Sequence, residues 1–358
     1  MKTKVLFFLP GLHGGGAEKV AVNILRLLDK EKYDLHLVLA EKKGKYLELV
    51  PLYVTIYDLK VKKTMFSILK LRNKIKEINP DIVFSTLFRT HIAIDLALMR
   101  IRNKPKIIYR SPNSPKLLLE NKQLSFLMTK LLERAYRNAD TIIAQTPEMK
   151  EEIIKYHSID PEKIQVFLNP VDTALIDEKI KNITNPFDEE HINILATGRL
   201  IEQKGFDVLI QSFKSVIDKN GSFRLYIIGE DVIGEKQNLL NLVKDLKLEK
   251  YIHFLGFQTN PYKYYYFSDL YVLSSRWEGL PNTVLENLYL KKPIVSTRCI
   301  PFMDTLINNG KNGFLVAIED SDALAKAILN YKSIDTTYKT IDFNYKSIDE
   351  IFTPKGMN

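Results

Sequence analysis

Two carboxylates in the second half of the chain stand where a helix could offer a site to an anionic ligand. Glu278 and Glu286 flank a proline at which an apolar strand-like run changes to a helical pattern. Proline suits a first helical turn because it lacks an N–H that would have no partner there. The amides of Asn282, Thr283 and Val284 are then expected to be free to bind an anion at the positive end of the helix dipole. Taken alone, a capped helix with a surface carboxylate explains this segment equally well.

Two cations upstream have the types and the spacing to hold a diphosphate. Arg199 and Lys204 stand on a glycine-bounded loop directly after the apolar run Ile192–Ala196. Arginine offers a fork of donors and lysine a point charge, so the pair could take the place of a metal ion beside a leaving diphosphate. Ordinary solvated surface cations would give the same pattern. The sequence contains no His-x-x-x-His pair and no Asp-x-Asp cluster at a strand end, so we expect neither a metal nor a cofactor.

Two further features of the first half could face a ligand. The segment Leu9–Glu18 runs from a strand through Gly14, Gly15 and Gly16 into a helix, which lets the backbone approach a phosphate. It has neither the spacing of a dinucleotide fingerprint nor a Walker ending. His91 follows a strand-like run and could enter a cleft, although a buried core histidine is the favoured interpretation.

The elements that must position these residues alternate between apolar strand-like runs and helix-length segments along the whole chain. This alternation predicts an α/β fold with two doubly wound domains, 1–172 and 173–332, and a polar tail, 333–358, that could return to the first domain. We expect ligands at the carboxyl ends of both sets of strands, in a cleft between the domains. Three of the expected helices are Lys63–Ile78, Leu117–Arg137 and, in the tail, Asn344–Phe352.

Composition restricts the class of protein. The net charge of +9 is uneven, with 30 Lys and Arg against 19 Asp and Glu in residues 1–172 and 22 against 24 in the remainder. A basic half could face a membrane, a phosphorylated substrate or nucleic acid, or simply carry surface lysines. A single cysteine suits a reducing compartment, and no run reaches the roughly 20 apolar residues that span a bilayer. We therefore expect a cytoplasmic protein, peripheral at the inner membrane face if it binds lipid.

Taken together, the motifs resemble those of the family-four (group 1) retaining glycosyltransferases, of the type that builds capsule, O-antigen and other lipopolysaccharide chains. Each motif is moderately specific, but their order and spacing cover nearly the whole chain. The motifs that carry the resemblance are Gly14-Gly15-Gly16-Ala17-Glu18, Asn169-Pro170-Val171-Asp172, Gly198-Arg199-Leu200 with Lys204-Gly205, Gly229-Glu230, Gly256, the segment from Glu278 to Glu286, and Asn312-Gly313-Phe314-Leu315-Val316.

The resemblance implies a GT-B fold of two facing Rossmann-like domains and a metal-independent transfer of a hexose or N-acetylhexosamine. The donor would be a nucleotide sugar, with UDP the expected nucleotide, and the acceptor would be a lipid-linked or growing polysaccharide. Retention would follow from front-face displacement, in which the leaving phosphate helps to deprotonate the acceptor hydroxyl.

The resemblance also implies residue roles. Arg199 and Lys204 would hold the diphosphate, Glu286 the ribose and Glu278 the transferred sugar, and His91 would stand near the chemistry. Arg110 and Asn113, after the fifth strand, would lie on the acceptor side. The donor-site positions are Gly15, Gly16, Arg199, Lys204, Gly229, Glu278, Gly279, Leu280, Asn282, Thr283, Val284 and Glu286.

Departures from the family pattern leave the base and the sugar open. Asp231 replaces a second glycine after Gly229, Asn287 replaces a small residue, and Lys291 stands where glycine is usual. A sugar-nucleotide epimerase or a non-catalytic nucleotide-sugar sensor of the same fold would share the motifs. A nucleic-acid-binding protein is not supported, because no helix-turn-helix, RNP-like or zinc signature is present.

A lysine-rich segment of the first half has the pattern of a membrane-surface helix. Met65, Ile68, Leu69 and Arg72 recur there at helical spacing among many lysines. Such a helix can lie on an anionic bilayer. An ordinary helix packed on the sheet, with a solvated lysine face, is the slightly favoured alternative.

Overall fold

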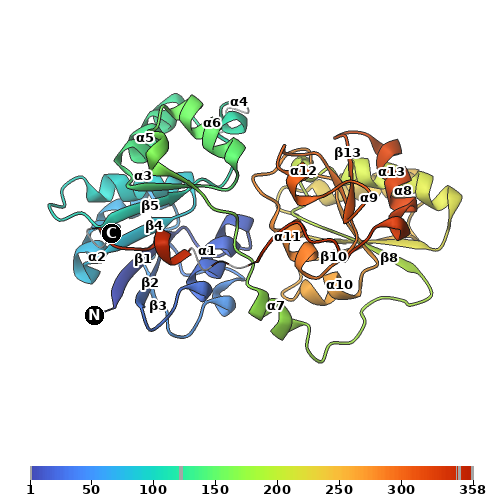
Figure 1. The fold of residues 1–358 in the computed structure, drawn as a ribbon, viewed down its shortest axis with the longest axis horizontal. Helices are drawn as coiled ribbons and strands as arrows, with labels where there is room; N and C mark the ends of the chain where they lie inside the picture. Colours follow the sequence, from blue (N-terminus) through green and yellow to red (C-terminus); the bar gives the residue numbers. More distant parts are fainter. Residues whose placement is uncertain (1, 121–123, 344, 346–347, 356–358) are drawn as a thin grey trace. The chain divides into compact units, whose positions relative to one another are not determined.

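The computed structural model describes residues 2–120, 124–343, 345 and 348–355. The chain forms two compact units, Met1–Asp172 together with Asn344–Asn358, and Thr173–Phe343. Both are parallel α/β units, drawn in Figure 1. Residues 333–343 lie with the second unit, so the segment that returns to the first unit begins at 344.

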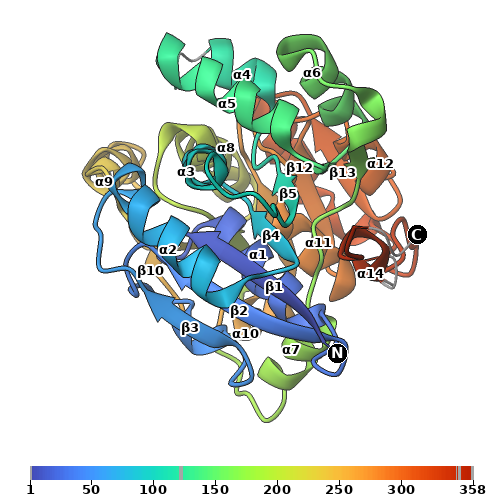
Figure 2. The same cartoon turned by 90° about the vertical axis from the view of Figure 1, so that its left-hand side faces the viewer.

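The first unit is built on a seven-stranded parallel sheet of order β3-β2-β1-β4-β5-β6-β7. Strands β1, β2 and β3 run beside one another in Figure 2. The strands are β1 (Thr3–Leu9), β2 (Tyr33–Leu39), β3 (Thr55–Asp58), β4 (Ile82–Ser85), β5 (Lys106–Arg110), β6 (Thr141–Ala144) and β7 (Ile164–Val166). The α-helices are α1 (Gly16–Leu27), α2 (Ile68–Ile78), α3 (Phe88–Leu98), α4 (Pro115–Glu120), α5 (Phe126–Asn138), α6 (Pro147–His157) and α14 (Ile348–Ile351).

Strand β1 is apolar throughout because both faces of this sheet are covered. Leu6 and Phe8 point into a core shared with α2, α3, α5 and α6, whereas Val5 and Phe7 point into a second core with α1. The chain's last helix, α14 (dark red in Figure 2), completes that second core, where the ring of Phe352 stacks on Phe7 at 6.0 Å. The returning segment is therefore part of the first unit's hydrophobic core.

The second unit is built on a six-stranded parallel sheet of order β10-β9-β8-β11-β12-β13. Its strands are β8 (Ile192–Thr197), β9 (Phe223–Ile228), β10 (Ile252–Gly256), β11 (Leu270–Leu273), β12 (Ile294–Thr297) and β13 (Gly313–Val316). Its α-helices are α7 (Thr173–Lys179), α8 (Phe206–Lys219), α9 (Glu235–Asp245), α10 (Tyr262–Phe267), α11 (Asn282–Tyr289), α12 (Met303–Leu306) and α13 (Ser321–Leu329). Helices α8, α9 and α13 pack on one face of this sheet.

Some expected elements differ from the structure. The helix expected over Leu117–Arg137 is divided into α4 and α5, with residues 121–123 outside the described part of the chain. The helix expected over Lys63–Ile78 starts as a 3₁₀ turn at Thr64 and becomes α-helical at Ile68. Of the segment Asn344–Phe352, α14 is helical, and residues 344, 346 and 347 lie outside the described residues. Helix α3 was not anticipated because it is buried on nearly every side and shows no polar stripe.

In the described part of the chain, no helix is both long enough and apolar enough to cross a bilayer.

Candidate functional site

The loop that follows β8 carries both predicted cations, and it depends on glycine for its shape. A 3₁₀ turn spans Glu202–Lys204, and Gly205 ends it in the left-handed region at a φ of 60°. A Cβ at Gly205 would lie 2.2 Å from the carbonyl oxygen of Ser274, so any other residue would push the two backbones apart. The turn thus holds the lysine loop against the loop that follows β11.

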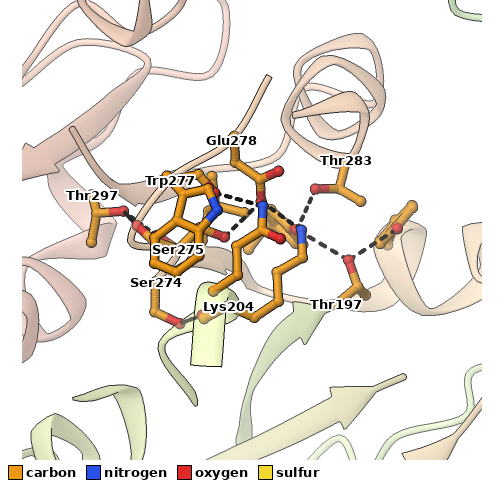
Figure 3. A network of polar contacts seen from close by, with 12 residues as sticks. Thr197, Lys204, Ser274, Ser275, Trp277, Glu278, Thr283 and Thr297 are labelled. Atoms are coloured by element: carbon orange, nitrogen blue, oxygen red, sulfur yellow. Dashed lines mark hydrogen bonds and ion pairs between the residues drawn. The ribbon is translucent and has the colours of Figure 1, made fainter. Parts of the chain in front are cut away.

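Lys204 and Glu278 form the central ion pair of the site. The Lys204 Nζ lies 2.5 Å from Glu278 Oε1, and the Ser275 hydroxyl donates to the same oxygen at 2.7 Å. Figure 3 shows the two charged side chains pointing toward each other from separate loops. Their side chains are 17% and 10% exposed, so the pair is largely withdrawn from water and only weakly screened. The predicted cation and the predicted sugar-binding carboxylate are therefore direct partners.

Further hydrogen bonds join these two loops around the ion pair. The Gln203 side chain donates to the Trp277 carbonyl at 2.8 Å, and the Arg276 amide donates to the Gln203 carbonyl at 2.8 Å. The Ser274 hydroxyl donates to the Lys204 carbonyl at 2.8 Å. Strands β8 and β11 are neighbours at the point where the strand order reverses, which is where doubly wound sheets bind ligands.

Arg276 fixes the outer side of the same site, a role that the sequence did not reveal. Its guanidinium donates to both carboxylate oxygens of Asp207, at 2.9 and 2.7 Å, to the Glu202 carbonyl at 2.6 Å, and to Glu319. Burial raises the pKa of Asp207, but the Arg276 hydrogen bond and charge outweigh it and hold that pKa below its usual value. The signal was present, since Arg276 opens the motif that contains Glu278, but its partners stand far away in the sequence.

The two predicted cations, Arg199 and Lys204, have no common partner among the described residues. Arg199 is exposed, and among the described residues its guanidinium has no hydrogen bond or ion pair. Gly229, predicted to contact the donor, is a point of close backbone approach, because a Cβ there would lie 1.7 Å from the Gly198 carbonyl oxygen. Across the described residues no group of three or more His, Cys, Asp or Glu side chains is arranged to hold a metal ion.

The helix α11 begins one residue after the proline that was expected to open it. Pro281 is the N-cap, and the amide of Val284 donates to the Pro281 carbonyl at 3.1 Å. The expectation that the Val284 amide is free for an anion is therefore wrong, because this amide already donates to a carbonyl within the first turn of the helix. Gly279 is half-buried and Leu280 is buried in the loop before the helix.

A separate hydroxyl network lies at the start of α11. The Tyr271 hydroxyl donates to Thr283 Oγ1 at 2.6 Å and lies 3.0 Å from Thr197 Oγ1. Burial raises the pKa of Tyr271 well above its usual value, and the charges of Glu278 and Glu286 add to the effect, so the phenol stays protonated. Glu286 is 1% exposed, so the predicted ribose contact lies beneath the surface.

In the first unit, the glycine-rich loop binds a carboxylate of its own chain. Gly14 and Gly15 donate their amides to Glu18 Oε2 at 2.9 and 3.2 Å, and α1 begins at Gly16. Burial raises the pKa of Glu18, and the two amides and His13 partly offset this. The loop is therefore an anion-binding backbone whose amides are held by a side chain from the next helical turn.

The two predicted acceptor-side residues have opposite environments. Arg110 is 2% exposed and donates to Thr86 Oγ1 at 2.8 Å and to Asn169 Oδ1. Asn113 is exposed, and its carbonyl accepts the Ser111 hydroxyl at 3.1 Å. Arg110 thus belongs to a buried polar network, whereas Asn113 lies on the surface turn that follows β5.

His91 is not placed where a substrate could touch it, which corrects the expectation of a cleft residue. Its ring is fully buried, stacks on Tyr109 at 4.5 Å and has Nε2 3.2 Å from the Ser85 carbonyl oxygen. Burial lowers the pKa of His91 to about 3, against a smaller opposing effect of the Ser85 hydrogen bond. The alternative interpretation, a core histidine, describes the residue.

Two α/β units with parallel sheets, one carrying an ion-paired site at its topological switch point, define a two-domain enzyme of the GT-B class. The profile described as "Glycosyltransferase Family 4" matches residues 14–175, and the profile "Glycosyl transferases group 1" matches residues 177–345. The two matches together cover nearly the whole chain. The chain belongs to the family-four (group 1) glycosyltransferases and has the GT-B fold.

Individual relatives agree with this assignment. An uncharacterized glycosyltransferase of Methanocaldococcus jannaschii is 32% identical over 76% of this chain, a match that spans 65% of that relative's length. A Campylobacter jejuni protein named N-acetylgalactosamine-N,N'-diacetylbacillosaminyl-diphospho-undecaprenol 4-alpha-N-acetylgalactosaminyltransferase is 27% identical over 91% of this chain and 89% of its own. The crystal structure of Anabaena HepE in complex with UDP-glucose has a TM-score of 0.74 at 19% identity and covers 91% of this chain and 89% of its own. Relatives named for lipopolysaccharide core biosynthesis in Rhizobium meliloti and capsular polysaccharide biosynthesis in Staphylococcus aureus are 26% and 27% identical over 68% and 85% of this chain, which supports a glycosyltransferase of polysaccharide or lipopolysaccharide biosynthesis.

Proposed function

We propose that this enzyme transfers a hexose or N-acetylhexosamine, with retention, from a UDP-linked donor to a lipid-linked acceptor at the cytoplasmic face of a membrane. The observation that carries the proposal is the Lys204–Glu278 pair at the switch point of the second unit. The Campylobacter relative is named for a diphospho-undecaprenol acceptor and an alpha product, and the Anabaena fold neighbour was crystallised with UDP-glucose. Both names support these finer assignments.

In this proposal the second unit binds the donor. Lys204 and Arg199 hold the diphosphate, Glu278 contacts the transferred sugar, Glu286 binds the ribose, and the amide of Thr283 faces a phosphate. Donor binding then requires Lys204 to share its ammonium between Glu278 and a phosphate oxygen, while the exposed Arg199 is free to swing in. We propose Gly15 and Gly16 as the backbone contacts that the first unit offers to the donor.

The chemical step breaks the bond between the anomeric carbon and the diphosphate oxygen and forms one to the acceptor oxygen on the same face of the sugar. The acceptor proton passes to the leaving phosphate, so the products are the glycosylated acceptor and UDP. The two cations neutralise the charge that develops on the leaving diphosphate. We propose that they make a metal ion unnecessary, which predicts full turnover in EDTA.

The donor site is tested by alanine substitution in the purified protein. Lys204→Ala and Glu286→Ala should each lower turnover at least 100-fold with a UDP-sugar and membrane extract, while the fold persists by circular dichroism. The matched control is Lys214→Ala, which removes a lysine from an exposed helical pair with Asp218 and should leave turnover within twofold. Turnover like wild type in both site variants would refute the proposal.

Other reactions of the same fold make different products. An epimerase would release free sugar and UDP without acceptor, and a sensor would bind donor without consuming it. Labelled UDP-sugar, incubated with and without membrane extract, separates the three. A screen of UDP-, GDP- and ADP-sugars by thermal shift identifies the base.

The lysine-rich segment made of the 3₁₀ turn Thr64–Ser67 and helix α2 exposes only some of its apolar side chains to solvent. Met65 and Ile68 pack against the core, and Arg72 donates to the carbonyls of Leu96 and Ala97 at the end of α3, both at 2.9 Å. These three residues are therefore arranged as in an ordinary helix packed on the sheet, the alternative that the sequence slightly favoured.

The remaining exposed residues support our proposal of an anionic membrane surface as a partner. Phe66 and Leu69 are 75% and 68% exposed, and Lys62, Lys63 and Lys70 are exposed around them. Apolar side chains among cations suit insertion into an anionic headgroup layer.

Vesicle sedimentation tests this surface. Phe66→Ser with Leu69→Ser should lower binding to phosphatidylglycerol vesicles at least tenfold. Val232→Ser with Ile233→Ser, at exposed positions of the second unit, should change it less than twofold. Equal binding by all three proteins would refute this surface.

A further inference from the structure

Arg110 is a buried cation for which the described part of the chain supplies no negative charge. Its side chain is 2% exposed, and no carboxylate of a described residue forms an ion pair with it. Burial lowers its pKa to about 9, with only the Tyr136 hydroxyl acting in the other direction, so the guanidinium is still charged at neutral pH. Arginine is almost never fully buried unless paired, because an unpaired buried charge is costly.

The partners of this guanidinium are neutral, and they leave donors unused. Nη1 donates to the Thr86 hydroxyl and Nη2 to the Asn169 side chain, whereas Nε has no partner among the described residues. The Asn169 amide in turn donates to Gln145 Oε1 at 3.0 Å. Hydroxyl and amide oxygens are weaker acceptors than phosphate oxygens, so an anion can take over these bonds.

The topology puts Arg110 at the edge of the sheet where ligands of doubly wound folds bind. Arg110 is the last residue of β5, Thr86 directly follows β4, and Gln145 directly follows β6. All these strands are parallel, so their carboxyl ends meet at one edge. The exposed residue Asn113 lies in the segment that leaves β5 at this edge.

We infer that Arg110 is the counter-ion of a diphosphate carried by the acceptor. This inference deepens the proposed function, since it names the chemical group by which the acceptor is recognised. The planar guanidinium suits a bidentate bond from Nε and Nη2 to two phosphate oxygens. The donor diphosphate has its own cations, Arg199 and Lys204, in the other unit.

The kinetic test compares one acceptor sugar with two aglycones, an alkyl diphosphate and a neutral alkyl ether. The wild-type enzyme should prefer the diphosphate in kcat/KM by about 100-fold, mostly through KM. Arg110→Gln should bring that preference below threefold, and Arg110→Lys, which keeps the charge without the fork, to about tenfold. UDP affinity, measured by calorimetry, reports whether the second unit is intact in each variant.

A loss of the same factor for both acceptors, or a preference unchanged in Arg110→Gln, would overturn the inference and make Arg110 a structural clamp on Asn169. If Arg110→Gln does not fold, the Arg110→Lys comparison decides alone.

A binding test without turnover separates this inference from the proposed reaction. Inorganic pyrophosphate should raise the Tm of Lys204→Ala, whose donor site is impaired, and should do so at least twofold less in Lys204→Ala with Arg110→Lys. Equal shifts in the two proteins would refute the acceptor site even if transfer were demonstrated. A difference would support it even if no transfer were found.

Discussion

Breaking the Lys204–Glu278 pair should destabilise the second unit by an amount that the structure sets. Lys204→Met keeps the length of the side chain, whose Cδ packs 2.9 Å from where a Cβ on Gly198 would stand. It removes the charge and leaves Glu278, 10% exposed, with the Ser275 hydroxyl as its remaining described partner. Removing one member of a fully buried pair costs about 3–5 kcal/mol.

The partial exposure of both side chains lowers the expected cost to about 2–3 kcal/mol, because water reaches the carboxylate that is left. For a unit of this size, a loss of 1 kcal/mol lowers Tm by about 2–4 °C, so Lys204→Met should lower it by about 4–12 °C. Adding Glu278→Gln removes the stranded charge and should recover most of that loss. The double variant remains inactive, since both groups belong to the proposed donor site.

Trp277 offers a local probe for this experiment, because it is the single tryptophan of the chain and is next to Glu278. Its fluorescence, followed during heating or urea unfolding, reports the second unit. The control is Lys214→Met, from an exposed helical pair with Asp218, which should cost less than about 0.5 kcal/mol. The reasoning fails if Lys204→Met unfolds at the wild-type midpoint, or if the double variant is no more stable than the single.

Three other outcomes follow from the geometry. Gly229→Ala puts a Cβ 1.7 Å from the Gly198 carbonyl oxygen, so it should lower Tm by at least 5 °C and weaken UDP binding in calorimetry; unchanged values would contradict the close approach. The folded pKa of His91, about 3, lies below its ordinary 6.5, so only the unfolded chain takes up this proton between those values. The free energy of unfolding should therefore decrease as the pH is lowered below 6.5, by at most about 1.4 kcal/mol per pH unit for this group. His91→Gln should reduce that slope in urea titrations and keep turnover within fivefold, whereas a 100-fold loss in a folded variant would restore a catalytic role. Burial raises the pKa of the Cys299 thiol to about 12, so the native protein should resist a thiol reagent at pH 8 and react once unfolded; fast native labelling would refute this.

The strand pattern was largely predictable because buried parallel strands are continuous apolar runs. Expected strands such as Ile82–Ser85 and Thr141–Ala144 coincide with β4 and β6. Helices were predictable where one face is polar, as for the helix expected over Pro147–Tyr156, which in the structure ends one residue later, at His157. Helix α3 was missed because its burial removes that alternation, and the division between α4 and α5 carries no proline or glycine that would signal a break.

The donor-site residues could be named from the order of the motifs, but the partners of their side chains could not be predicted. Nothing in the sequence indicates that Lys204 is paired with Glu278 while Arg199 is not, because residues 74 apart meet only through the sheet. The same holds for Glu18, whose carboxylate takes the loop amides that a phosphate was expected to use.

The sequence by itself determined the class of this protein, its two-unit organisation and the residue types at its site. These follow from local causes, namely the periodicity of apolar residues, the punctuation by glycine and proline, and the order of the motifs. Only the tertiary structure decided which charges meet. It pairs Lys204 with Glu278, buries His91 in the core, and leaves Arg110 without a described counter-ion. The physical reason is that burial and pairing depend on which strand ends become neighbours, and strand order is a property of the folded sheet.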